Sequence, residues 1–513
     1  MAFSRFCRQS IPLARRVLAA ACAVAPLLLA APVAAQTAVG VEQLWVNNCL
    51  RCHGQNGQGG GAGTSTLLSD DLMDQSHDLR FYQVIKRGLP ESGMEAFGET
   101  LEDAQVWALV GYIRELQHRD WRKRVGSTRA DATGTVRTQR HAFRIERVVE
   151  HGLRIPWSVE FLPDGRMLIA DRPGQLRVHS TGKPGGVLSA PVEGTPQVRH
   201  RGQGGLMDVA VHPRHAENGW IYLAYSHPRQ LDGREVSMTR IVRGKLRESQ
   251  GRLAWVDQQI IFDARPEHDL PGDLHFGCRI VFDPKDPSIL FFSIGDRGRM
   301  EMAQSLDRPN GKVHRIRDDG SIPEDNPFAA GRETMPTAYP SIWSYGHRNP
   351  QGLVFDLNGH LWDTEHGPRG GDELNRIAPG KNYGWPVVSF GFNYNGRPFA
   401  TPWPAKEVSV DAPSTDGVAM PVYRWMPSIG ACGLDVARGP AFPDWRGDLL
   451  AGGLSGQNVD RIRVAPDGNA LVEREEILHG LGRVRDVVVG PDGSVYVALN
   501  DPDQIIRLAP AER

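Results

Sequence analysis

From about residue 143 onward, one local pattern recurs, and this repetition constrains the fold more than any other feature of the chain. Each copy is an apolar strand, a turn of the Pro-Asp-Gly kind and a second apolar strand, as in Val159–Gly165 followed by Met167–Ile169. Five further copies begin at Val209, Ile280, Leu353, Phe442 and Val487. Such repeats are typical of β-propeller blades, and 57 glycines and 37 prolines in 513 residues suit a fold with many turns. We therefore predict an all-β, six-bladed β-propeller over residues 143–513. A β-sandwich is the alternative, but a sandwich does not repeat one hairpin six times.

Chemically distinctive residues precede each copy by a few positions. In a propeller, the loops that enter the innermost strands open on one face around the central axis, so these residues are expected to converge on one pocket. They are Trp157, Gln203, His275, Arg348, Asn349, Ser428, Arg483 and Arg485. Arg483 and Arg485 alternate with Val484, so both side chains point to the same side of a strand. Together with Arg348 they predict an anion site suited to carboxylates.

The segment before the repeats carries a haem-attachment motif. Cys49-Leu50-Arg51-Cys52-His53 matches the C-x-x-C-H signature of c-type haem. The thiols of Cys49 and Cys52 can both form thioethers to one haem, and His53 then lies under the iron as an axial ligand. A redox dithiol is the alternative, but it does not explain the histidine. We predict one covalent haem c.

The surroundings of this motif predict a small all-α cytochrome c domain over residues 36–120. A helix is expected to begin at Thr100, with Asp103 as a capping-box-like signal, followed by apolar residues at helical spacing. Met94 lies in a glycine-flanked loop before this helix and is the predicted sixth iron ligand. Met73 is the alternative ligand.

The N-terminus predicts export. Four arginines precede the apolar run Val17–Ala31, and the small residues Val33-Ala34-Ala35 follow it, which is the pattern of a cleaved signal peptide over residues 1–35. A membrane anchor is the alternative, but the run is short for ~30 Å of hydrocarbon. We expect a periplasmic protein with no transmembrane segment in the mature chain.

The net charge of the chain bears on the kind of partner that it can bind. With 59 Lys and Arg against 60 Asp and Glu, the formal net charge is −1, which argues against a nucleic-acid binder. Residues 121–142 are rich in arginine and poor in apolar residues. They are predicted to form a basic, solvated linker between the two domains, and a docking strip for an acidic partner is the alternative.

Six motifs follow one another in the repeat region. They are Gln203-Gly204-Gly205-Leu206, His275-Phe276-Gly277, Gly295-Asp296-Arg297-Gly298, Gly346-His347-Arg348-Asn349-Pro350-Gln351-Gly352, Glu365-His366-Gly367-Pro368 and Asn382-Tyr383-Gly384-Trp385-Pro386. Together they resemble the soluble pyrroloquinoline quinone (PQQ) aldose sugar dehydrogenases of the glucose/sorbosone dehydrogenase family, over about residues 143–510. The N-terminal domain resembles a class I cytochrome c. The resemblance implies PQQ on the propeller axis, together with calcium.

The resemblance also implies roles for individual residues. His275 resembles the general base that removes the sugar hydroxyl proton, and Asp296 resembles its orienting partner. Arg348 resembles the residue that polarises the quinone carbonyl. The implied PQQ-binding residues are Gln203, Asn349, Ser428, Arg483 and Arg485. The implied calcium ligands are the backbone carbonyls of Gly367 and Pro368 beside the cofactor, and Asp372, Glu373 and Tyr383 at a second, structural site.

Some positions depart from the family pattern. Leu274 stands where glucose-oxidising members carry a carboxylate, and Ser455 stands where some members place a lysine on PQQ. Both departures concern substrate identity and cofactor affinity. Cys278 and Cys432 lie near the predicted pocket in sequence. They could pair in a disulfide, but we expect buried free thiols.

These features predict a PQQ-dependent oxidoreductase. It would oxidise the C1 hydroxyl of an aldose sugar to a lactone by hydride transfer to PQQ, pass the electrons to the haem c, and deliver them to a downstream respiratory acceptor. A calcium-dependent propeller hydrolase of the lactonase kind is one alternative, but it does not explain three arginines or a haem. A non-enzymatic binding propeller tethered to a cytochrome is the other.

Overall fold

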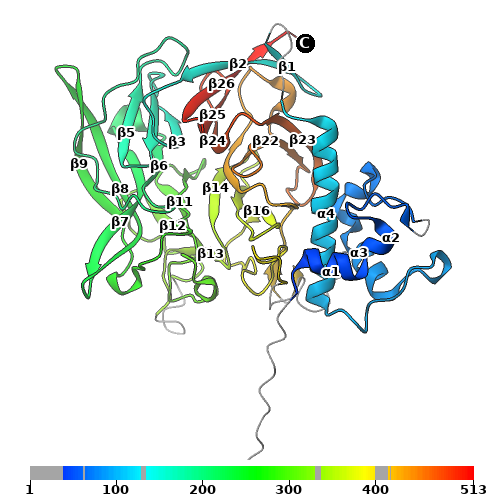
Figure 1. Cartoon of the computed structure of the whole chain (residues 1–513). Helices are drawn as coiled ribbons and strands as arrows, with labels where there is room; N and C mark the ends of the chain where they lie inside the picture. The colour runs from blue at the N-terminus through cyan, green and yellow to red at the C-terminus, as the bar shows by residue number, and fades with distance from the viewer. Residues whose placement is uncertain are drawn as a thin grey trace, which may run out of the picture. The chain divides into compact units, whose positions relative to one another are not determined.

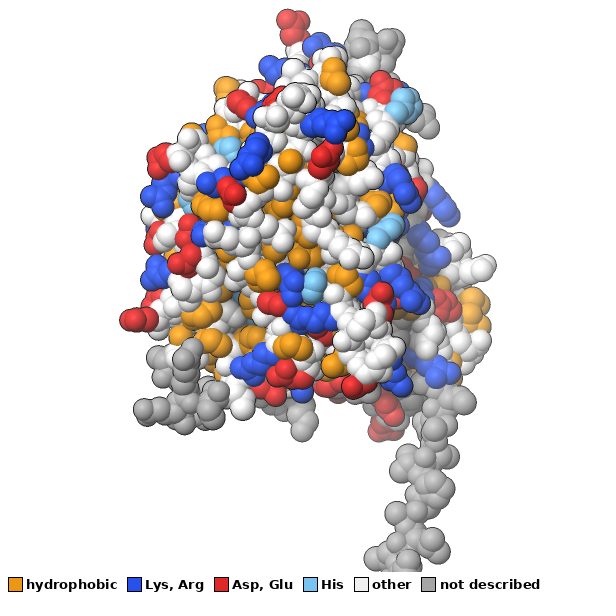
Figure 2. Space-filling model, turned by 90° about the vertical axis from the view of Figure 1, so that its left-hand side faces the viewer, with side chains coloured by type: hydrophobic (Ala, Val, Ile, Leu, Met, Phe, Trp, Pro, Cys, Tyr) orange, Lys and Arg blue, Asp and Glu red, His pale blue; other side chains and the backbone are white. Residues whose placement is uncertain are grey.

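Six antiparallel β-sheets make up most of the protein (Figure 1) and confirm the predicted six-bladed propeller. The computed structural model describes residues 39–61, 64–128, 134–329, 337–398, 414–415 and 417–512, and the predicted signal peptide lies outside them. Within these ranges, no helix combines the length and the apolar character needed to cross a bilayer. Figure 2 shows acidic, basic and hydrophobic side chains interspersed on one face, in keeping with the small net charge.

The first five sheets follow the chain order of their strands. The first two contain β3 (Pro156–Phe161), β4 (Met167–Asp171) and β5 (Gln175–His179), then β6 (Leu206–Val211), β7 (Ile221–Leu231), β8 (Arg234–Ser249) and β9 (Arg252–Phe262), with the short helix α5 (His215–Asn218) between β6 and β7. The third contains β10 (Ile280–Phe282), β11 (Ile289–Ile294), β12 (Lys312–Arg317) and β13 (Ile342–Tyr345). The fourth and fifth contain β14 (Pro350–Phe355), β15 (Leu361–Glu365), β16 (Asp372–Ile377) and β19 (Tyr423–Trp425), then β20 (Ala431–Val436), β21 (Leu449–Gly453), β22 (Asn458–Val464) and β23 (Leu471–His479). A separate pair joins β17 (Ser414–Thr415) to β18 (Val418–Ala419).

The sixth sheet combines strands from both ends of the propeller segment. β1 (Thr135–Arg137) and β2 (Ala142–Val149) come from its start. They join β24 (Arg483–Val489), β25 (Val495–Asn500) and β26 (Gln504–Ala511) through the β2–β26 pairing. Backbone hydrogen bonds between the two ends therefore close the ring of blades.

Carboxylates on the innermost strands join neighbouring blades. Asp208 accepts a hydrogen bond from the Ile280 N–H at 2.7 Å, Asp435 accepts one from the Val489 N–H at 2.7 Å, and Asp486 accepts one from the Val159 N–H at 2.9 Å. The Nη1 of Arg279 lies 3.1 Å from both Asp208 and Asp486 and so connects innermost strands across the centre. These buried polar groups are thereby paired, as burial requires.

In five of the six predicted copies, the predicted strands lie within or beside observed strands. In the copy that begins at Phe442, the prediction is wrong in part. Phe442–Gly447 was expected to be its first strand, but this segment contains a short 3-10 turn over Pro443–Trp445. The innermost strand of that blade is Ala431–Val436 instead. Its small residues suit the crowded centre, where a Cβ on Gly433 would lie 2.5 Å from the Cα of Asp486.

The N-terminal domain is helical. It contains α1 (Val41–Asn48), α2 (Leu50–His53), α3 (Asp78–Arg87) and α4 (Asp103–Val125). The helix expected from Thr100 begins at Asp103, because Glu102 is the N-cap and forms a capping box with Gln105. Apolar residues of α1 and α4 form a buried core that includes Trp45, Val106 and Leu109.

One face of α4 packs against the propeller. A Cβ on Gly111 would lie 3.2 Å from the Phe392 ring, so a larger residue there would crowd the contact. One and three turns further along α4, Glu115 pairs with Arg369, and Arg122 pairs with Glu476 of β23. Gly111, Glu115 and Arg122 are separated by four and seven residues, so they share one helix face.

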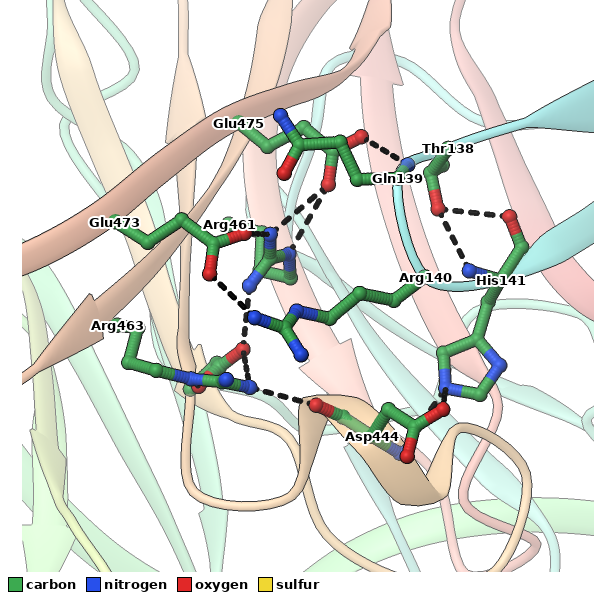
Figure 3. A network of polar contacts seen from close by, with 10 residues as sticks. Thr138, Gln139, Arg140, His141, Asp444, Arg461, Arg463, Glu473 and Glu475 are labelled. Atoms are coloured by element: carbon green, nitrogen blue, oxygen red, sulfur yellow. Dashed lines mark hydrogen bonds and ion pairs between the residues drawn. The ribbon is translucent and has the colours of Figure 1, made fainter.

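The chain that follows α4 is also held on the fifth blade. The Thr128 N–H donates to the His479 carbonyl at 3.1 Å. Figure 3 shows Arg140 beside Glu473, to which it donates at 2.6 Å. The predicted basic segment thus contains the end of α4, and its arginines Arg122 and Arg140 bind acidic residues of β23.

Candidate active site

The loops that enter the innermost strands surround a cavity of about 440 Å³. The predicted residues that line it are Trp157, Gln203, Asn349, Ser428, Arg483 and Arg485. His275 and Arg348 are not part of this lining, but each hydrogen-bonds to a residue that is. The His275 N–H donates to the Gln203 side chain at 2.8 Å, and Arg348 Nη1 donates at 3.1 Å to the carbonyl of His366, which lines the cavity. The structure therefore brings the predicted residues together.

A buried carboxylate aligns the imidazole of His275. Its Nδ1 lies 2.6 Å from Asp296 Oδ1, and the Gly298 N–H also donates to this oxygen at 2.7 Å. The other oxygen of Asp296 accepts a hydrogen bond from the Trp385 indole at 2.8 Å. Because Nδ1 is bound to the carboxylate, Nε2 is the nitrogen left to accept a proton.

His275 and Asp296 both have the protonation state that general-base catalysis by the imidazole requires. Burial lowers the pKa of His275 below its ordinary value, and the nearby charge of Arg348 acts in the same direction. Burial by itself would raise the pKa of Asp296. The hydrogen bond from His275, together with the charges of His275 and Arg348, outweighs burial and brings the pKa below the ordinary value. The imidazole is therefore neutral and the carboxyl ionised at neutral pH.

The backbone at the base is strained. His275 has a φ of 52° and Arg297 a φ of 58°, in the left-handed region that non-glycine residues rarely adopt. Arg297 helps to hold this conformation, since its Nε donates to the Leu274 carbonyl at 2.8 Å and its guanidinium lies 3.6 Å from the centre of the Phe276 ring. Such strain is commonly found at functional sites.

Unpaired donors beside the cavity indicate an anionic ligand. The buried Nε atoms of Arg172, Arg348 and Arg485, and Nε2 of His366, have no hydrogen-bond partner among the described residues. Burial, with the charges of Arg483 and Arg172, lowers the pKa of Arg485 to about 10, so it remains a cation. Buried donors without partners are costly, and a tricarboxylate such as PQQ would satisfy them. The residues present thus fit the implied cofactor.

Gly367 and Pro368, the predicted carbonyl ligands of the cofactor calcium, line the cavity. The side chain of Asp372 accepts hydrogen bonds that hold the Gly367 backbone in place and connect it to Ser428 and Ala431. Its Oδ1 accepts from the Gly367 N–H at 2.9 Å and from the Ser428 hydroxyl at 2.7 Å. Its Oδ2 accepts from the Ala431 N–H at 2.8 Å.

Glu373, predicted at a second calcium site, belongs to a buried acidic group. Asn375 Nδ2 donates to Glu373 at 3.1 Å and to Glu365 at 3.0 Å. Both oxygens of Asp363 are buried without a hydrogen-bond partner among the described residues, and His347 Nδ1 lies 3.5 Å from Asp363 Oδ2. Burial and neighbouring carboxylates raise the pKa values of Asp363 and Glu373. Carboxylate oxygens suit Ca²⁺, so this group fits a hard cation. The predicted Tyr383 instead donates its hydroxyl to the Arg376 carbonyl at 2.6 Å.

The haem motif lies at the junction of α1 and α2. Cys49 and Cys52 are free thiols, and the buried Nδ1 of His53 has no hydrogen-bond partner among the described residues. Met94 packs against the same helical core, in a loop held by paired hydrogen bonds with Leu89 at 3.0 and 3.1 Å. These groups fit the predicted haem. Cys278 and Cys432 are buried free thiols, as expected.

Several residues of the site were not predicted. Trp385 and His366 lie within quoted motifs, but nothing in those motifs marked the indole as a partner of Asp296 or the imidazole as part of the cavity lining. Arg172, Tyr394 and Glu115 also line the cavity. Glu115 belongs to α4 of the helical domain, and no local pattern could have assigned it to a propeller pocket.

The propeller and the helical domain match two different protein families. A family model described as glucose/sorbosone dehydrogenase matches residues 153–507. A model described as cytochrome c oxidase, cbb3-type, subunit III matches residues 36–113.

Characterised and solved relatives cover the propeller. Aldose sugar dehydrogenase YliI of Escherichia coli (strain K12) is 38% identical over 367 residues, which are 71% of this chain and 92% of that protein. The apo crystal structure of the soluble aldose sugar dehydrogenase from Escherichia coli has a TM-score of 0.62 at 36% identity, over 72% of this chain and 100% of the other. The PQQ-bound aldose sugar dehydrogenase from Streptomyces coelicolor has a TM-score of 0.55 at 26% identity, over 75% and 99%.

Proposed function

Because the chain belongs to the glucose/sorbosone dehydrogenase family and carries a cytochrome c domain, we propose that it oxidises the C1 hydroxyl of aldose sugars to lactones in the periplasm. The observation that carries this proposal is the hydrogen-bonded pair of His275 and Asp296 beside a cavity with several unpaired arginine donors. A neutral, aligned imidazole can remove a hydroxyl proton, and the arginines suit an anionic cofactor.

The chain's own residues prepare the reaction. His275 Nε2 receives the proton of the C1 hydroxyl, and Asp296 stabilises the imidazolium that forms. Arg348 is held by its hydrogen bond to the His366 carbonyl, and its buried Nε has no hydrogen-bond partner among the described residues. Arg172, Arg483 and Arg485 would hold the carboxylates of PQQ. Bound PQQ supplies a quinone that accepts a hydride from carbon.

The proposal also includes calcium ions and a haem. The carbonyls of Gly367 and Pro368 would hold a calcium ion beside the cofactor, and Glu373 with Asp363 and Glu365 would hold a second one. Cys49 and Cys52 would bind one haem c covalently, with His53 and Met94 as its axial ligands. His/Met ligation gives a raised potential, which suits the cytochrome domain to relay electrons to a downstream respiratory acceptor.

The full-length protein, reconstituted with PQQ and calcium, is tested with a panel of aldoses. We expect a sugar-dependent appearance of the reduced haem absorption bands, with the lactone as product. Haem that stays oxidised while an artificial acceptor is reduced would overturn the relay. If no aldose is oxidised with either acceptor, the sugar assignment is wrong. Turnover of lactones by protein that lacks PQQ would favour a propeller hydrolase instead.

A further inference from the structure

The cavity of the propeller has a wall contributed by the cytochrome domain. Among the described residues that line it, Glu115 comes from α4, whereas the others belong to the propeller. The side chain of Glu115 is 12% exposed and lies at the junction between the domains. Residues 254 positions apart meet here, because Glu115 pairs with Arg369.

Glu115 is held in a fixed orientation. Arg369 Nε and Nη2 donate to its two carboxylate oxygens at 2.9 and 2.8 Å, which is a bidentate pair. The guanidinium of Arg369 lies 4.8 Å from the centre of the Phe392 ring. The same ring packs against Gly111, one turn before Glu115 on α4. Glu42 of α1 is a second acidic partner of Arg369, at 2.7 Å.

Among the described residues that line the cavity, Glu115 is the one carboxylate, and the arginines are Arg172, Arg369, Arg483 and Arg485. Arg172 and Arg485 both lie over Trp157, at 5.6 and 4.3 Å from its ring centre, so basic groups gather there. Glu115 brings a carboxylate to the cavity lining beside Arg369. A carboxylate is a poor neighbour for a tricarboxylate cofactor, but it is a strong acceptor for the hydroxyl groups of a neutral sugar.

We propose that Glu115 is a specificity-determining residue that accepts hydrogen bonds from sugar hydroxyls away from C1, so that the cytochrome domain completes the substrate pocket. Arg369 positions the carboxylate. This inference rests on the proposed sugar oxidation and adds to it the contact that recognises the sugar. It also gives the fusion of the two domains a role in substrate binding besides electron transfer.

The test compares Glu115→Ala with Glu42→Ala in the full-length, PQQ- and calcium-loaded protein, with an artificial electron acceptor. Both variants remove one acidic partner of Arg369, but Glu42 is not part of the cavity lining, which makes it the matched control. Glu115→Ala is expected to raise KM for the best aldose about tenfold, the loss of one charge-assisted hydrogen bond, with kcat within about twofold. Glu42→Ala should leave KM within about twofold, and Glu115→Gln, which keeps one acceptor oxygen, should recover part of the loss.

Two binding measurements separate this role from a structural one. Calorimetry with the 1,5-anhydro form of the best aldose, which lacks the C1 hydroxyl and is not oxidised, should give a Kd raised about tenfold by Glu115→Ala. The Kd for PQQ should stay unchanged. An unchanged KM and sugar Kd, equal effects of the two alanine variants, or weaker PQQ binding with normal sugar binding would each overturn the proposal. If the unmodified protein oxidises no aldose, it is the proposed function that fails.

Discussion

At the scale of single residues, the site depends on how burial and neighbouring charges set protonation. His275 stays neutral although it touches an ionised carboxyl, because burial and the charge of Arg348 both disfavour the imidazolium. Asp296 stays ionised although it is buried, because it accepts hydrogen bonds from His275, Trp385 and Gly298. Both environments therefore favour the unprotonated form, which leaves a neutral imidazole beside an ionised carboxylate.

The lowered pKa of His275 predicts the pH profile. A base must be unprotonated, and a pKa below the usual value of about 6.5 keeps the imidazole unprotonated to lower pH. We expect the acidic limb of kcat/KM with an artificial acceptor to lie below pH 6.5. A limb above this pH would contradict the proposed environment of His275.

Replacing the carboxylate tests the alignment of the base. Asp296→Asn keeps the shape of the side chain but no longer favours the reactive tautomer of His275. A fall of about ten-thousandfold in kcat is expected, with the Kd for PQQ unchanged by calorimetry. Near-normal kcat would mean that Asp296 does not orient the base.

Cofactor binding can be tested at Arg485. Its Nε is buried without a partner, and its guanidinium lies over Trp157. Arg485→Gln removes the charge and should weaken PQQ binding by about 10- to 100-fold in calorimetry. Arg147→Gln, at an exposed ion pair with Glu150, is the control and should bind PQQ normally.

At the scale of elements, the innermost strands are stabilised by carboxylates that reach the next blade. Arg279 is central to this arrangement because it serves Asp208 and Asp486 on two different strands. Burial raises the pKa of Asp486 to about 7 even with Arg279 beside it. Removing the arginine would leave two buried carboxyls without their cation.

Arg279→Met is therefore expected to lower the free energy of unfolding by about 3–5 kcal/mol, measured by guanidinium denaturation. Arg147→Met, which removes a solvent-exposed pair, should change it by less than ~1 kcal/mol. Similar values for the two variants would show that the central arginine does not hold the blades together.

At the scale of the whole molecule, α4 contacts both domains: it packs in the helical core and it also binds the propeller. Its apolar residues, such as Val106 and Leu109, complete the helical core, while Glu115 and Arg122 bind the propeller. The pairing of β2 with β26 holds the chain that follows α4 in the last blade. The two domains are therefore expected to unfold as one unit.

Thermal unfolding of the full-length, haem-loaded protein should give the same midpoint by haem absorbance and by the far-ultraviolet signal of the propeller. Arg122→Ala removes the pair with Glu476, which is largely buried, and should lower the shared midpoint by a few degrees. Separate transitions in the unmodified protein would contradict the coupling of the domains.

The sequence by itself determined what depends on neighbouring residues. Alternation and turn residues predicted the blades, and the spacing of Cys49, Cys52 and His53 predicted the haem motif. Alternation about Val484 predicted two arginines on one side of a strand; both line the cavity, although a β-bulge between Val484 and Asp486 interrupts the regular alternation of β24. Only the tertiary structure decided what depends on contacts between distant segments. The small innermost strand of the fifth blade, the β2–β26 closure and the approach of Glu115 to Arg369 belong to this class. No local pattern encodes them, because each is fixed by packing between segments far apart in the chain, 254 residues in the case of Glu115 and Arg369.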